Sequence, residues 1–252
     1  MIRLDATTVL LQWAVGGLLF LWVTCRHRQV GIGYGWLLRI TYIVILVSAF
    51  LIAVLTEVVL AREIITMGVV VATTIPLFNS YLKRKEVNRS LNPNLDLVAP
   101  ILGLVALVLA ALDAGGSPAL AIARTLVGAV FLGAVSDAML LGHWYLVQPG
   151  LTRAPLLELV RLIGVIWPFE LAVLLYPTGM LSVINGTIDD GYGGLLGWFW
   201  IACTIMTIIL VFVTRAALKE RQYSAVMAAT GLLYLAILTG FGMDLVARAT
   251  LI

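Results

Sequence analysis

Long apolar runs occupy most of this 252-residue chain. A helix that crosses the hydrocarbon core of a bilayer needs about 20 mostly apolar residues. Eight runs reach or approach that length, at residues 7–25, 36–60, 64–82, 97–113, 119–143, 155–177, 194–214 and 224–245. A single helix satisfies its own backbone hydrogen bonds in lipid, whereas barrel strands would alternate polar and apolar residues. The sequence therefore predicts an all-α, polytopic transmembrane helix bundle of about eight spans.

The composition leaves little room for anything else. Hydrophobic residues make up 62% of the chain and charged residues 12%, whereas about 25% of a soluble domain is charged. Eight spans of about 20 residues take up about 160 residues, so only short loops remain. We therefore expect residues 1–252 to form a single integral membrane domain, with any chemistry inside the bundle or at its rims.

Basic residues alternate between the predicted connections. The loops after the first, third, fifth and seventh runs hold most of the Lys and Arg residues, namely Arg26, Arg28, Lys83, Arg84, Lys85, Arg89, Arg153, Arg215, Lys219 and Arg221. Cytoplasmic loops of membrane proteins are enriched in these residues. We therefore expect both termini outside, in the cell membrane of a bacterium or archaeon. The net charge of +3 is then a topology signal, and no nucleic-acid partner is expected.

Matching residues at several helix ends suggest an internal duplication. The first run ends at His27 and the fifth at His143, while the second and sixth runs open around Arg39 and Arg161. Four spans per half would give both halves the same orientation. Repeats at 1–114 and 115–252 would then be related by an axis along the membrane normal. The alternative is that cytoplasmic helix ends resemble one another because basic residues collect there.

Ionisable residues inside spans are costly, so each is a candidate for function. Asp137 lies in the cytoplasmic half of the fifth run, and Glu170 lies near the middle of the sixth, directly after Pro168. Both are candidate proton carriers. Arg39 and Arg124 lie near span ends, where long side chains are expected to snorkel to water.

Further ionisable residues are assigned to the membrane rims. Glu158 and Arg161, three residues apart, are expected to pair on one helix face. The outer rim is expected to hold Glu57, Arg62, Glu63 and Asp244.

The segment 136–145 combines a carboxyl group, an imidazole and two aromatic rings. A quinone headgroup needs hydrogen-bond donors and a proton acceptor that works near neutral pH, which histidine provides. Asp137 and His143, six residues apart, do not share a helix face. The alternative is an aromatic belt that anchors the helix at the interface. The hypothetical quinone-binding residues are Asp137, His143, Trp144, Tyr145, Glu158 and Arg161.

Other cofactors receive less support. His27 and His143 are the only histidines. Two histidines on different helices can ligate haem, but His27 lies in a basic stretch outside its span, so haem is not expected. The chain has too few soft ligands for copper or zinc. Cys25 and Cys203 lack a redox spacing, and residues 189–191 are expected to form an exposed turn.

No complete phosphate-loop, hydrolase or metalloprotease motif is present, so no residue is assigned a catalytic role. The preferred hypothesis is a membrane subunit of an electron-transfer complex of the respiratory type, with a quinone-accessible site at the cytoplasmic rim. Its partners would be the lipid bilayer and other membrane subunits. The first alternative is a small proton-coupled transporter or permease that uses Asp137 and Glu170. Further alternatives are a non-catalytic scaffold or assembly protein and a membrane enzyme of an unfamiliar type.

Overall fold

The structure, a computed structural model, describes residues 4–83, 93–177 and 179–251. All regular elements in these ranges are helical. The long ones are α1 (Ala6–Cys25), α2 (Ile32–Leu55), α3 (Leu60–Leu82), α4 (Val98–Asp113), α5 (Pro118–Val147), α6 (Ala154–Leu175), α8 (Leu195–Ala217) and α9 (Tyr223–Thr250). Two short elements lie in loops: the 3-10 helix η2 (Pro93–Leu97) precedes α4, and α7 (Met180–Ile184) lies between α6 and α8.

The prediction of a helical membrane protein is confirmed. Seven helices are long and apolar enough to cross a membrane, namely α1 to α5, α8 and α9. The remaining long helix, α6, has 22 residues but carries three charged ones, Glu158, Arg161 and Glu170. A helix lies at each predicted run. The largest differences are at the C-terminal ends of α2, which ends at Leu55, and of α9, which continues to Thr250.

Local signals fix several helix ends. Asp5 caps α1, because its carboxylate accepts the backbone N–H groups of Thr7 at 3.1 Å and Thr8 at 3.0 Å, which have no partner within the helix. Pro118 begins α5, a position where the missing N–H costs nothing. Prolines also lie inside two helices, at Pro76 in α3 and Pro168 in α6, as membrane helices tolerate.

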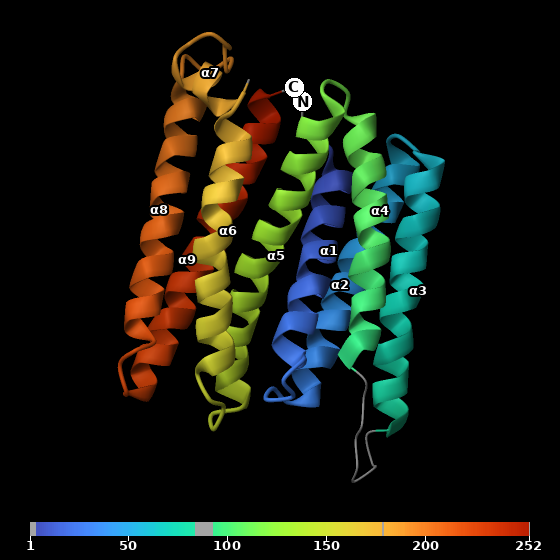
Figure 1. The fold of residues 1–252 in the computed structure, drawn as a ribbon, viewed down its shortest axis with the longest axis vertical. Helices are drawn as coiled ribbons and strands as arrows, with labels where there is room; N and C mark the ends of the chain where they lie inside the picture. Colours follow the sequence, from blue (N-terminus) through green and yellow to red (C-terminus); the bar gives the residue numbers. More distant parts are fainter. Residues whose placement is uncertain (1–3, 84–92, 178, 252) are drawn as a thin grey trace.

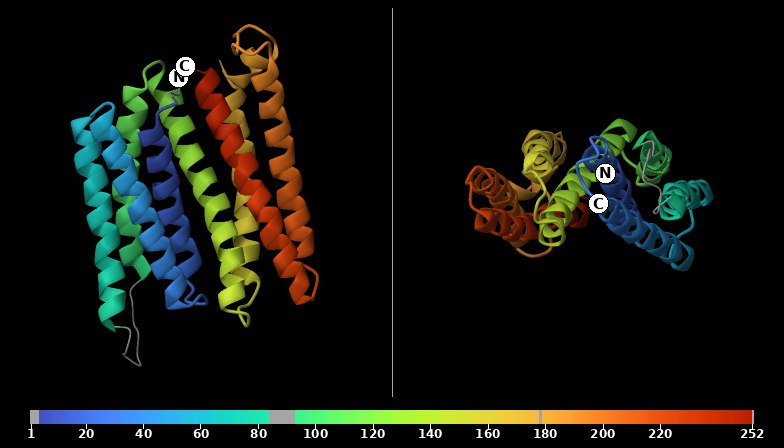
Figure 2. Two further views of the ribbon diagram at one scale, coloured as in Figure 1. Left: turned by 180° about the vertical axis from the view of Figure 1, so that it is seen from behind. Right: turned by 90° about the horizontal axis from the view of Figure 1, so that it is seen from below.

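The long helices form two four-helix groups (Figures 1 and 2). In the first half, α1 packs on α2 and α4, and α3 packs on both of these. In the second half, α5 packs on α6 and α9, and α8 packs on both of these. The halves meet mainly where α5 packs on α1 and α4. Each half therefore has the same order of neighbours around its ring.

Small residues bring α1 and α5 into backbone contact at the centre of the bundle. A β-carbon at Gly16 would overlap the carbonyl group of Ala129, and one at Gly133 would overlap the backbone of Gly16. Close approach through small residues is a common way for membrane helices to pack, because lipid supplies no hydrophobic force between them. We call this contact of Gly16, Ala129 and Gly133 the central seam.

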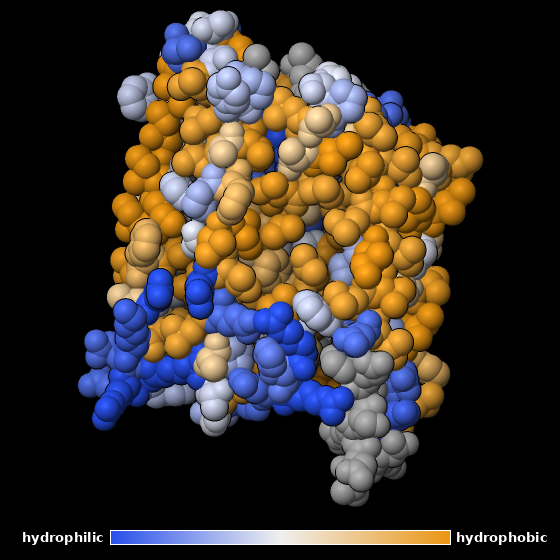
Figure 3. All heavy atoms as spheres, viewed as in Figure 1, coloured by the Kyte–Doolittle hydropathy of each residue, from blue (hydrophilic) through white to orange (hydrophobic). Residues whose placement is uncertain are grey.

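The two ends of the bundle differ in polarity. The helix α1 begins and α9 ends at one end, here called the terminal end (Figure 1). Apolar residues cover the middle of the face in Figure 3, and hydrophilic residues gather at the opposite end, here called the basic end. The loops at that end hold Arg26, Arg28, Arg153, Lys219 and Arg221, whereas Arg84, Lys85 and Arg89 lie outside the described residues.

Asp190 organises the connection between α7 and α8. Its carboxylate accepts backbone N–H groups from Tyr192 at 2.9 Å, Gly194 at 2.8 Å and Leu196 at 2.9 Å, at the start of α8. These donors hold the pKa of Asp190 below its usual value, with Gly194 making the largest contribution. The acidic turn is thus exposed, as predicted, and its second carboxylate is a helix cap.

Acid is expected to loosen this connection. The pKa of Asp190 is lower in the folded protein than in the unfolded chain, where it is about 3.9. The ionised Asp190 carboxylate therefore stabilises the fold above the unfolded pKa, and this stabilisation is lost as pH falls through the lower pKa of the folded protein. Hydrogen exchange at Gly194 and Leu196 should therefore show protection at pH 5 that disappears toward pH 3. Asp190→Asn should lose this pH dependence. Asp189→Asn is the matched control, because Asp189 accepts the Gly191 N–H at 2.9 Å, which lies in the turn before α8.

Candidate functional site

Asp137 is completely buried in the bundle. Tyr42 of α2 donates its phenolic hydrogen to Asp137 Oδ1, and the Tyr34 hydroxyl lies 3.4 Å from the Asp137 carbonyl oxygen. The second carboxyl oxygen, Oδ2, has no hydrogen-bond partner among the described residues. Gly17 of α1 permits this arrangement, because a β-carbon there would overlap the Tyr42 ring. We call Tyr34, Tyr42 and Asp137 the inner cluster.

A second buried polar group joins α1, α5 and α9. Arg248 Nε donates to Asp244 Oδ2 at 2.8 Å, one helical turn earlier on α9. Another nitrogen of the same guanidinium donates to Gln12 Oε1 of α1. Gln12 completes the network by donating from Nε2 to the Thr125 carbonyl oxygen of α5 at 2.6 Å. The Arg248 charge is thus compensated by Asp244 and oriented by Gln12.

Glu170 of α6 faces this network. Its side chain is 0% exposed, and neither carboxyl oxygen has a hydrogen-bond partner among the described residues. A β-carbon at Gly128 would lie 2.7 Å from Gln12 Nε2, 3.2 Å from Asp244 Oδ1 and 3.7 Å from Glu170 Oε1. The amide and both carboxyl groups therefore converge on Gly128. We call Gln12, Glu170, Asp244 and Arg248 the outer cluster.

The two clusters lie at different depths. Gly128 is ten residues from the first residue of α5, Pro118, and Asp137 is ten residues from its last, Val147. Each cluster is therefore about 15 Å from its own end of the helix, and about 14 Å of helix separates the two. Asp137 and Glu170 thus belong to separate sites, with the central seam between them.

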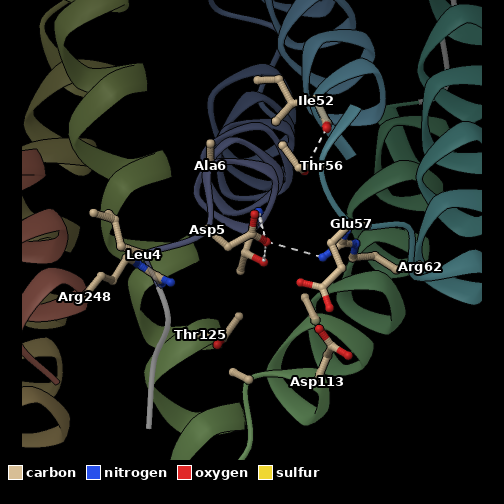
Figure 4. Close-up of a pocket in the computed structure, with 13 residues that line it drawn as sticks. Leu4, Asp5, Ala6, Ile52, Thr56, Glu57, Arg62, Asp113, Thr125 and Arg248 are labelled. Atoms are coloured by element: carbon tan, nitrogen blue, oxygen red, sulfur yellow. Dashed lines mark hydrogen bonds and ion pairs between the residues drawn. The ribbon is translucent and has the colours of Figure 1, made fainter. Parts of the chain in front are cut away.

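A pocket with a volume of about 350 Å³ opens at the terminal end (Figure 4). Carboxylates from three helix ends line it: Asp5 before α1, Glu57 after α2 and Asp113 at the end of α4. Thr125 and Arg248 also line it, so the pocket reaches two residues that take part in the hydrogen bonds of the outer cluster. We call this cavity the outer pocket.

The aromatic segment at the basic end does not gather around one space. His143 is exposed, with Nδ1 3.4 Å from the Tyr234 hydroxyl. Trp144 donates from Nε1 to Gln148 at 3.1 Å and packs beside Tyr34. Tyr145 is buried, and its hydroxyl donates to the Thr152 carbonyl oxygen at 2.5 Å. Successive helix residues are about 100° apart, which explains why the three side chains diverge.

The expected pairing of Glu158 with Arg161 is wrong. Among the described residues, Glu158 forms its ion pair with Arg26, at the C-terminal end of α1. An arginine from another helix thus reaches Glu158 at the basic end. Arg161, on the same helix, is exposed.

The expectation that Arg39 and Arg124 snorkel to water is also wrong. Arg39 is 6% exposed and forms a bidentate ion pair with Asp96 of η2, with its shortest bond 2.7 Å long. Arg124 is 1% exposed, and its Nε donates to the Val173 carbonyl oxygen at 2.8 Å. Both guanidinium groups find partners inside the protein, which removes the need to reach water.

Sequence reasoning found Asp137 and Glu170 but missed the residues around them. Asp244 and Arg248 carried a usable signal, since an acidic and a basic residue four positions apart share a helix face. Gln12 is a polar amide in an apolar run, which also marks a candidate. Tyr42 carried no signal, because a single tyrosine in an apolar run does not indicate which helix its hydroxyl will contact.

No group of three or more His, Cys, Asp or Glu side chains in the described ranges is arranged to hold a metal ion. The chain matches no family model, and no curated protein or solved structure is significantly similar to it. Its function therefore has to be argued from the two clusters and the outer pocket.

Proposed function

We propose that the chain is a small proton-coupled transporter with Asp137 and Glu170 as its proton carriers. It has eight spans, with α6 as the eighth, and both termini outside the cell membrane of a bacterium or archaeon. The basic loops support this orientation, because they lie at the end opposite the termini. The similar helix order in the two halves supports a duplication of 1–114 and 115–252, which would give the transporter two parts that move against each other.

One observation carries this proposal: two fully buried carboxyl groups, at two depths, have oxygens without a hydrogen-bond partner among the described residues. Buried polar atoms are almost always paired in proteins, and an ionisable residue inside a membrane is a functional candidate by default. Such carboxyl groups suit a proton that is bound at one stage of a cycle and released at another. The divergent side chains at the basic end support a quinone pocket less well.

Removing either carboxyl group is expected to abolish coupling. The protein would be reconstituted in liposomes that contain a pH-sensitive dye, and a panel of solutes would be screened for solute-dependent proton movement. Asp137→Asn and Glu170→Gln keep the shape of each side chain but remove the titrating group. We expect solute-dependent proton movement in the unaltered protein and none in either variant.

Glu158→Gln is the matched control, because Glu158 is partly exposed and paired with Arg26 at the basic end. This variant should retain coupling. Full coupling in both buried variants would exclude these carboxyl groups as carriers and would remove the basis of the proposal.

A second candidate is the quinone-linked subunit of an electron-transfer complex. The contact of His143 with the Tyr234 hydroxyl favours it, because an imidazole beside a phenol at an exposed position can exchange protons with a quinol. His143→Ala should then abolish quinone-dependent turnover of the native complex without changing its subunit composition. His27→Ala, which removes the other exposed histidine at the basic end, serves as the control for general disturbance of this rim. Unchanged turnover in His143→Ala would eliminate this candidate.

A further inference from the structure

A proton carrier that is buried in the bundle needs a route to water, and the outer pocket lies next to the outer cluster. We propose that the outer pocket is the aqueous entrance to Glu170 and that Arg248 is the charged gate between them. This inference rests on the proposed carrier role of Glu170. It adds the side of the membrane from which water reaches Glu170 and the residue that controls this access.

The pocket and the cluster share a wall. Arg248 lines the pocket, while its guanidinium binds Asp244 and Gln12 inside the cluster. Thr125 also lines the pocket, while its carbonyl oxygen accepts the Gln12 amide at 2.6 Å. Thr125 and Arg248 thus belong both to the pocket wall and to the hydrogen-bond network of the cluster, and Arg248 is the charged one.

Glu170 lies behind this wall with its carboxyl oxygens unpartnered. Toward the terminal end of the bundle, the charged residues on α5 and α9 are Arg124, Asp244 and Arg248, while Asp137 of α5 and Arg215 of α8 lie farther toward the basic end. When Glu170 is ionised, the Arg248 guanidinium can turn from Asp244 toward it, which opens the wall. A hydronium ion in the pocket then transfers its proton to a Glu170 oxygen, which leaves a water molecule, and Arg248 returns to Asp244. Gly128 leaves space for this movement, because it places no side chain between the groups.

The charge of the entrance favours protons and other cations. Three carboxylates line the pocket, from Asp5, Glu57 and Asp113, against two guanidinium groups. Both guanidinium groups have acidic partners: Arg62 binds Glu63 at 2.6 Å and Asp5 of the pocket wall at 3.3 Å, and Arg248 binds Asp244. Glu57 and Asp113 then supply the remaining negative charge of the pocket. A cleft with an excess of one charge raises the local concentration of the opposite charge by about tenfold or more.

The route ends at the outer cluster in this conformation. The next residues of α5 toward the basic end include Phe131, Leu132 and Val135, all 0% exposed, and the central seam closes the same level. Glu170 therefore has access toward the terminal end only. Asp137, on the other side of this apolar layer, requires a different conformation or a different route.

Accessibility of introduced cysteines tests the entrance and the gate. Thr125→Cys lies on the pocket wall, Glu170→Cys lies behind Arg248, and Ser136→Cys is a buried control beside Asp137. Membrane-impermeant cationic and anionic thiol reagents would be applied to right-side-out and inside-out vesicles, with labelling measured by mass spectrometry. The unaltered chain, with Cys25 and Cys203, gives the background.

Thr125→Cys should react from the terminal side, about tenfold faster with the cationic reagent than with the anionic one. Glu170→Cys should react slowly when Arg248 is present and about tenfold faster with Arg248→Gln, whereas Arg248→Lys should keep the slow rate. If Arg248→Gln fails to fold, Gln12→Ala removes one anchor of the gate and should give intermediate acceleration.

An unreactive Thr125→Cys, or labelling of Thr125→Cys from the basic end, would contradict the proposal that the outer pocket is the aqueous entrance to Glu170. Equal labelling of Glu170→Cys in the unaltered, Arg248→Gln, Arg248→Lys and Gln12→Ala backgrounds would overturn the gate. Labelling measures access and needs no proton movement. A failure of the carrier role would therefore show as full coupling in Glu170→Gln with the access pattern intact, which separates the two proposals.

Discussion

Adding one methyl group at Gly133 is expected to lower the free energy of unfolding by about 3 kcal/mol, the upper part of the usual range for overpacking. The new β-carbon of Gly133→Ala would overlap backbone atoms of Gly16. A backbone cannot turn aside as a flexible side chain can, so α1 and α5 would have to separate along the central seam. Thermal unfolding in detergent, followed by tryptophan fluorescence, measures the effect.

Gly231→Ala is the matched control for this experiment. Gly231 lies inside α9, and a β-carbon there meets no atom within 4 Å. Replacing a helical glycine in open space should leave stability unchanged or raise it by about 0.5–1 kcal/mol. Equal losses in the two variants would show that helix propensity and not the seam decides the outcome.

Replacing Arg39 with methionine is expected to cost about 3–5 kcal/mol, because it leaves the Asp96 carboxylate buried without its partner. The two side chains are each 8% exposed, and Arg39 donates to both Asp96 oxygens. This pair attaches η2, and with it the start of α4, to α2. Chemical unfolding of the variant in mild detergent gives the measurement.

A double replacement separates burial from charge at this site. Arg39→Met combined with Asp96→Leu removes both charges, so it should be less damaging than Arg39→Met alone, as is common for buried ion pairs. Arg215→Met, at an exposed end of α8, is a control that should change stability little. An effect of Arg39→Met as small as that of the control would restore the snorkelling interpretation.

Much of the fold follows from the sequence because lipid imposes simple requirements. Runs of apolar residues must be helices of bilayer length, and a helix lies at each of the eight predicted positions. The predicted eighth run ends at residue 245, before Arg248, whereas α9 continues past this residue. The ion pair of Arg248 with Asp244 neutralises both charges, so the helix continues to Thr250.

The site could be predicted only in part. Asp137 and Glu170 were identifiable because a carboxyl group inside a membrane span has an energetic cost on any face of the helix. Their neighbours depend on which helices pack together, and these contacts join residues far apart in the sequence. Tyr42 is 95 residues from Asp137. The prediction of a shared pocket for His143, Trp144 and Tyr145 rested on proximity in sequence, whereas helix geometry sends the three side chains in different directions.

The hydrogen bond between Gln12 and Arg248 has a consequence for synthesis of the protein. These residues are 236 positions apart, and a chain emerges from the ribosome with its N-terminal end first. The α1 helix must therefore enter the bilayer before its amide has this partner, which arrives only when α9 is inserted. Formation of this contact marks the insertion of α9, and a protein truncated before α9 would leave the Gln12 amide oxygen without the Arg248 donor.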